Sequence, residues 1–89
     1  MKSLHIIIKG TVTGVGFRWW LKINAEERSI CGFVKNRTQS EVEAVLVGQE
    51  KDLEDILKLC KKGPSSANVE NIKIADYKKV YLKKSFDIL

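Results

Sequence analysis

The order in which two hydrophobic periodicities follow one another constrains the fold of this chain most strongly. Short β-branched segments with alternating apolar residues indicate strands, and two longer segments with apolar residues three and four positions apart indicate helices. In chain order, the sequence predicts strand Leu4–Lys9, helix Phe17–Arg28, strands Ile30–Lys35 and Glu41–Val47, helix Glu50–Lys62, and strands Val69–Ile74 and Phe86–Leu89. This β-α-β-β-α-β order is typical of an α+β, ferredoxin-like sandwich. We therefore expect an antiparallel sheet with two helices packed on one face, and an extra short C-terminal strand.

Each predicted element has one apolar face that we expect to enter the core. Alternation in the strand Glu41–Val47 places Val45 on the outward face, together with Glu41 and Glu43. Acidic residues at the start of the second helix and lysines at its end complement the helix dipole. The expected core residues are Leu4, Ile6, Ile8, Phe17, Trp20, Leu21, Ala25, Val42, Ala44, Leu46, Leu53, Ile56, Leu57 and Cys60.

Length and composition favour one small globular domain, residues 1–89, in a reducing compartment. The chain has 89 residues, of which 44% are hydrophobic and 30% charged, values ordinary for a globular protein. Its two cysteines, Cys31 and Cys60, have no CxxC or histidine-rich companions, so a zinc site of recognisable spacing is excluded and free thiols are favoured over a disulfide. Without an apolar stretch of about 20 residues or a signal-peptide pattern, we expect a cytoplasmic protein.

A glycine-rich segment joins the first strand to the first helix and ends on Arg18. The run Gly14-Val15-Gly16 allows successive backbone N–H groups to point into one concavity, and the helix N-terminus adds partial positive charge there. Arg18 adds a planar fork that can bind two phosphate oxygens. The segment predicts a phosphate cradle, although it lacks the P-loop spacing and carries Trp19 where the dinucleotide fingerprint needs its third glycine.

The net charge of +5 and the isoelectric point near 9.3 raise the question of nucleic-acid binding. RNA-recognition motifs share the predicted element order, and Cys31–Lys35 weakly matches their aromatic signature. That match lies on the second strand rather than the third and lacks paired aromatics for base stacking. The lone histidine, His5, is expected on the strand surface. The excess lysines are better explained as a solvated face that also attracts small anions.

Four motifs occur together in a fixed order: Gly10-x-Val12-x-Gly14-Val15-Gly16-Phe17-Arg18, Gly32-Phe33-Val34-Lys35-Asn36, Val42-Glu43, and Gly63-Pro64-Ser65-Ser66-Ala67-x-Val69. This set resembles the acylphosphatase family over essentially the whole chain. The resemblance implies hydrolysis of carboxylic–phosphoric anhydrides without a metal or a cofactor. It also implies that Arg18 and Asn36 are catalytic and that the loop of Thr13, Gly14, Val15, Gly16 and Phe17 binds the substrate.

The chemistry of this reaction fits such a small set of groups. Phosphoryl transfer depends mainly on positioning and charge stabilisation, which Arg18 and the loop amides can supply. The side-chain amide of Asn36 can orient a water molecule without acting as its base. We expect a small-molecule acyl phosphate as partner, no nucleic acid, no membrane, and a monomer. Two alternatives stay open: a non-catalytic anion or acyl-phosphate sensor, and an RNA-binding sandwich.

The sequence departs from the family pattern at three places. Thr13 stands where a glutamine is usual, and Arg28-Ser29 replaces the Leu-Gly that commonly ends the first helix. Thr38 and Ser40 replace the usual Asp and Gly of the hairpin. None of these changes touches Arg18 or Asn36, so we expect the activity to be retained.

Overall fold

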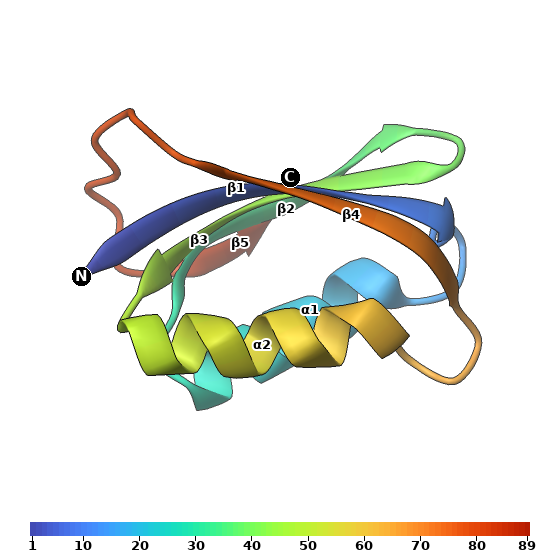
Figure 1. Cartoon of the computed structure of the whole chain (residues 1–89), viewed down its shortest axis with the longest axis horizontal. Helices are drawn as coiled ribbons and strands as arrows, with labels where there is room; N and C mark the ends of the chain where they lie inside the picture. The colour runs from blue at the N-terminus through green and yellow to red at the C-terminus, as the bar shows by residue number, and fades with distance from the viewer.

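The computed structural model describes all 89 residues and confirms the predicted order of elements. The elements are β1 (Lys2–Thr11), α1 (Phe17–Glu27), β2 (Cys31–Thr38), β3 (Glu41–Gly48), α2 (Glu50–Lys62), β4 (Asn68–Asp76) and β5 (Phe86–Ile88). The five strands form one sheet in the order β4-β1-β3-β2-β5. Both helices cover the same face of this sheet, as Figure 1 shows, so the ferredoxin-like sandwich is confirmed.

The sheet is mixed rather than wholly antiparallel, because β5 runs parallel to β2. The other three pairings, β1 with β3, β1 with β4, and β2 with β3, are antiparallel as expected. The direction of β5 follows from its connection. The chain leaves β4 at one edge of the sheet and crosses to the opposite edge along the same end, so β5 runs antiparallel to β4 (Figure 1). Since β2 is also antiparallel to β4, β5 and β2 point the same way.

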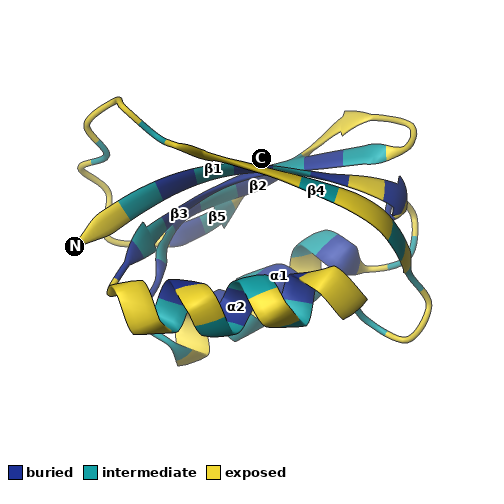
Figure 2. Ribbon diagram, in the orientation of Figure 1, coloured by how far each residue is buried: buried dark blue, intermediate teal, exposed yellow.

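The core lies between the sheet and the two helices, and its members are largely those predicted from periodicity. Twelve of the fourteen expected residues are buried, and Trp20 and Leu57 are partly buried against them. Figure 2 shows the buried positions on the inner sides of the helices and on alternate residues of the central strands. The core thereby holds α1, which carries Phe17 and Arg18, against β2, which carries Asn36.

Val45 keeps the predicted alternation in β3, because it lies on the face away from the helices with His5 and Phe33 as its register partners. On that face it is fully buried rather than exposed. Its neighbour across the β2–β3 ladder is Phe33, whose ring lies 6.4 Å from that of Tyr81. The segment of residues 77–85 crosses this open face of the sheet, and the Tyr81 hydroxyl donates a 2.8 Å hydrogen bond to the Gly32 carbonyl. Because this segment is distant in sequence, the hydrophobic pattern of β3 alone could not predict that Val45 is buried.

The end of α1 keeps the left-handed turn that a glycine would usually make, with a serine in its place. Ser29 has φ 54° and follows the last helical residues in a double hydrogen-bonded cap. The Ser29 N–H donates to the Glu26 carbonyl at 3.1 Å, and the Ile30 N–H donates to the Ala25 carbonyl at 2.9 Å. This is the Schellman arrangement. In the turn of the β2–β3 hairpin, residues 38–41, by contrast, no residue has a positive φ, and a bulge separates Asn36 from Thr38.

The two cysteines are both free, as predicted. Cys31 is half-buried in β2, and Cys60 is buried in α2. Burial raises the pKa of the Cys60 thiol to about 12, so this thiol is a packing group rather than a nucleophile. Neither helix combines the length and the apolar character needed to cross a membrane.

Candidate active site

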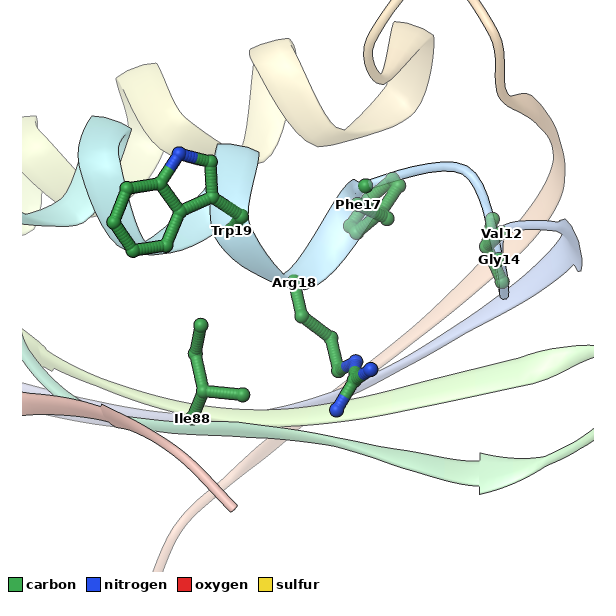
Figure 3. Close-up of a pocket in the computed structure, with 7 residues that line it drawn as sticks. Val12, Gly14, Phe17, Arg18, Trp19 and Ile88 are labelled. Carbon is green, nitrogen blue, oxygen red and sulfur yellow. The ribbon is translucent and has the colours of Figure 1, made fainter.

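A small hollow of about 160 Å³ opens at the N-terminal end of α1. Its polar side consists of Gly14, Gly16 and Arg18, and its apolar side consists of Val12, Phe17, Trp19 and Ile88. Figure 3 shows these groups around the start of the helix, with the strands of the sheet beneath. The hollow therefore combines the β1–α1 loop with one residue from the far end of the chain.

The β1–α1 loop presents unpaired backbone donors. Gly14 and Gly16 have φ values of 72° and 76°, a left-handed conformation that side chains rarely adopt. A β-carbon at either position would meet no atom within 4 Å, so the glycines are required by the backbone conformation and not by crowding. The first hydrogen bond of the helix runs from the Trp20 N–H to the Gly16 carbonyl. The N–H groups from Gly14 to Trp19 have no acceptor within the protein, an arrangement suited to an anion.

The Arg18 side chain is the only charged group lining this hollow. It is half-buried, yet its guanidinium forms neither a hydrogen bond nor an ion pair with any protein group. In Figure 3 the side chain leaves the start of α1 and extends toward the sheet. The other two arginines are both engaged, Arg28 with Asn24 and Arg37 with Glu41. Five N–H donors of Arg18 are therefore available for a planar, bidentate contact with an anion.

Two hydrogen bonds fasten the β1–α1 region to the β2–β3 hairpin. The Thr13 hydroxyl donates to the Gln39 carbonyl at 2.6 Å, and the Gly10 N–H donates to the Ser40 carbonyl at 2.9 Å. Thr13 thus uses its side chain to hold the loop in place, which accounts for the packing of the loop without the usual glutamine. The same contact brings the tip of the hairpin next to the loop.

Asn36 lies near the end of β2, on the helix-covered face of the sheet. Its alternate neighbour Val34 is fully buried on that face, and its partner in β3, Val42, is buried as well. Val34 is also in register with Ile88, which lines the hollow. Two residues of strand span about 6.6 Å, so Asn36 lies about one such step beyond this register position. Its side chain is exposed and has no hydrogen-bond partner within the protein.

The structure brings four of the seven predicted site residues into the hollow. Gly14, Gly16, Phe17 and Arg18 line it, whereas Thr13, Val15 and Asn36 do not. Trp19 and Ile88 line it although the sequence did not single them out as site residues. For Trp19 the available signal was its place directly after Arg18. For Ile88 there was none, because its position depends on the pairing of β5 with β2.

The Gly63–Val69 motif packs against Phe17, which is one of the residues that line the hollow. A β-carbon on Gly63 would lie 3.1 Å from the Phe17 ring and 3.3 Å from side-chain atoms of Ala67 and of Val69. Phe17 is almost fully buried and packs its ring on Trp20, with centroids 5.2 Å apart. The turn after α2 is therefore shaped to hold Phe17, and Phe17 fixes the first turn of α1. No group of three or more His, Cys, Asp or Glu side chains is placed to hold a metal ion.

Comparison with known proteins gives a consistent result. Residues 4–88 match the family model described as acylphosphatase. An acylphosphatase of Azorhizobium caulinodans is 42% identical over 73 residues, which cover 82% of this chain and 78% of that protein. One from Koribacter versatilis is 35% identical over 98% of this chain and 79% of its own length. The crystal structure of acylphosphatase from Bacillus subtilis superimposes with a TM-score of 0.93 at 31% identity, covering 100% of this chain and 99% of that one.

Proposed function

Because this chain belongs to the acylphosphatase family, we propose that Arg18 and Asn36 are its catalytic residues. The protein is a hydrolase that cleaves the anhydride bond of an acyl phosphate with water, releasing a carboxylate and inorganic phosphate. The observation that carries the assignment of Arg18 is the juxtaposition of its unpaired guanidinium with a run of free backbone amides in one hollow. The assignment of Asn36 is supported by its unpaired side chain on the helix-covered face of β2 and by the family motif that ends on it.

Arg18 and the loop Thr13–Phe17 bind the phosphoryl group. The guanidinium contacts two of its oxygens, and N–H groups of the loop and of the first turn of α1 donate to the oxygens that remain. These donors are already held in place by the left-handed glycines and by the hydrogen bond from Thr13. Charge that shifts between the phosphoryl oxygens and the leaving group in the transition state is therefore stabilised without reorganisation of the protein.

Asn36 positions the attacking water. Its carbonyl oxygen accepts a hydrogen bond from the water, and its NH₂ group donates to a phosphoryl oxygen. The water oxygen attacks phosphorus in line with the anhydride oxygen, the P–O bond to the acyl group breaks, and the proton of the water passes to a phosphoryl oxygen of the product. The bonding electron pair leaves with the carboxylate. Carboxylic acids have a pKa of roughly 4–5, so this leaving group needs no proton from a general acid, and the reaction needs no metal ion.

The test is the hydrolysis of acetyl phosphate in chelator-treated buffer. Arg18→Ala and Asn36→Ala are each expected to lower kcat/KM by about 10²–10³-fold, the usual loss when one oriented charge-stabilising group is removed. Arg37→Ala and Asn71→Ala are matched controls, since the Arg37 guanidinium is already paired with Glu41 and Asn71 lies in β4, which contributes no residue to the hollow. Catalytic variants that keep more than a tenth of the wild-type activity would refute the assignment.

The inhibition constant of inorganic phosphate separates the two roles. Arg18→Ala is expected to weaken phosphate binding together with turnover. Asn36→Ala is expected to lower kcat while phosphate still binds, because Asn36 acts chiefly on the water. Calorimetry that shows tight phosphate binding by the wild type, combined with no turnover, would select the alternative of a non-catalytic anion sensor.

We also propose that the chain works as a single-domain monomer in the cytoplasm. One continuous hydrophobic cluster joins both helices to the sheet, and both cysteines are free, as is usual in a reducing compartment. The partner of the site is a small-molecule acyl phosphate and not a nucleic acid. Light scattering after size-exclusion chromatography tests the monomer directly, with a dimer mass as the contrary result.

A further inference from the structure

We propose that Trp19 and Ile88 form an acyl-binding wall beside Arg18, and that this wall selects acyl phosphates with an apolar, above all aromatic, acyl group. This inference rests on the proposed function, because it concerns the part of the substrate that Arg18 and the glycine loop do not hold. It assigns a substrate class to the site from the residues of this chain.

The hollow has two chemically different halves, which Figure 3 displays side by side. Arg18 and Gly14 lie toward one side, and the ring of Trp19 and the side chain of Ile88 lie toward the other. An acyl phosphate has the same division, since a single oxygen joins the anionic phosphoryl group to the acyl carbon. With the phosphoryl group at Arg18, the acyl group has to lie within the same hollow or directly outside it.

The Trp19 ring offers apolar surface that the fold does not use. Its side chain follows Arg18 on the first turn of α1, and the residue is 58% exposed. It stacks with no other aromatic ring, and its indole N–H makes no hydrogen bond. The adjacent Trp20 differs, because it packs on Phe17 and against the core. An exposed tryptophan beside a free guanidinium is suited to stacking on a flat ligand group.

Ile88 is held at the hollow by the short strand β5. Its register partner in the parallel pair is Val34, and the Leu89 N–H donates to the Val34 carbonyl at 2.9 Å. Ile88 is 37% exposed and lines the hollow, whereas Leu89 is more exposed and does not. β5 thus brings one branched side chain to the apolar half and fixes it there.

The size and the polarity of the hollow decide which acyl groups fit. The hollow of about 160 Å³ also has to hold the phosphoryl group, so an aromatic acyl ring has to extend from it over the exposed Trp19 side chain. A benzoyl group can stack on the indole, while the methyl group of acetyl phosphate covers little of it. A charged acyl group would lose hydration against Trp19 and Ile88 with no second cation in the hollow to pair it.

The test compares benzoyl phosphate with acetyl phosphate through the ratio of their kcat/KM values. We expect the wild type to favour benzoyl phosphate and Trp19→Ala to reduce the ratio by about 10-fold, as for the loss of one aromatic contact. Ile88→Ala is expected to reduce it by about 3-fold, the loss of a smaller apolar contact, and Trp19→Phe to retain most of it. Ile23→Ala and Leu89→Ala are the matched controls, since both remove exposed apolar groups outside the hollow.

Two outcomes would overturn the acyl-binding wall: a ratio that is unchanged in Trp19→Ala and Ile88→Ala, or one that falls equally in the controls. Binding of benzoylphosphonate and acetylphosphonate, in which a carbon–phosphorus bond replaces the anhydride, gives the same comparison without turnover. A preference for the benzoyl analogue with no hydrolysis of either phosphate would support the wall and refute the catalytic roles. Hydrolysis of both phosphates at equal efficiency would do the reverse.

Discussion

Replacing Ser29 with glycine should stabilise the protein. Ser29 is held at φ 54° by the double hydrogen-bonded cap of α1, and its side chain is exposed and makes no hydrogen bond that the change would remove. A left-handed conformation costs a non-glycine residue about 1–2 kcal/mol. Glycine does not have this cost, but it makes the unfolded chain more flexible, which lowers the free energy of unfolding by about 0.4–1 kcal/mol. The expected net gain for Ser29→Gly is therefore about 0.5–1 kcal/mol in the free energy of unfolding.

Urea unfolding followed by tryptophan fluorescence measures this gain. The midpoint should rise with no change in the m-value, and the melting temperature should rise by about 2–8 °C for a chain of this size. Ser29→Ala is the control, because alanine keeps the β-carbon and with it the conformational cost. A midpoint for Ser29→Gly at or below that of the wild type, or an equal gain in Ser29→Ala, would refute the reasoning.

Three further expectations concern the loop, the open face of the sheet and the thiols. Thr13→Val removes the hydrogen bond to Gln39 and should lower kcat/KM for acetyl phosphate several-fold, whereas Thr13→Ser should retain it. Burial raises the pKa of Tyr81 above its ordinary value, so the stabilisation that the Tyr81 hydroxyl provides is complete below about pH 10 and is lost as the pH rises further. In urea titrations across this range, the free energy of unfolding should decline less steeply with pH in Tyr81→Phe than in the wild type. Thiol alkylation followed by mass spectrometry should modify Cys31 before the buried Cys60, and the opposite order would contradict the assigned burial.

Local pattern was sufficient for most of the fold because most elements pack through their own periodicity. Leu53, Ile56 and Cys60 are spaced to form one helical face, and that face is buried. The direction of β5 and the burial of Val45 could not be derived in this way. Both depend on the path of residues 77–85 across the sheet, and that path is set by contacts between distant parts of the chain rather than by a repeating pattern.

The residues of the candidate site likewise include some that local sequence predicts and some that depend on distant contacts. The glycines and Arg18 are consecutive in sequence, so their chemistry could be predicted before their positions were known, and the structure places them together. Ile88 enters the hollow only because β5 pairs with β2, where its partner Val34 lies more than fifty residues earlier in the chain. No short motif encodes such a pairing. Ser29 is an intermediate case. Sequence showed that glycine was missing from the helix end, and the structure shows that the left-handed turn is kept without it.

The position of β1 between β4 and β3 has a consequence for folding kinetics. Lys2 is in register with Gly48 and Leu4 with Asp76, so the strand that delivers the glycine loop is completed only by segments remote in sequence. Contacts between such distant residues form only after large loops have closed, and closing these loops costs conformational entropy before any contact stabilises the chain. Folding of such topologies typically takes milliseconds to seconds. Recovery of enzymatic turnover in a refolding experiment should accordingly coincide with the slow assembly of the whole sheet, and no early helical intermediate should be active.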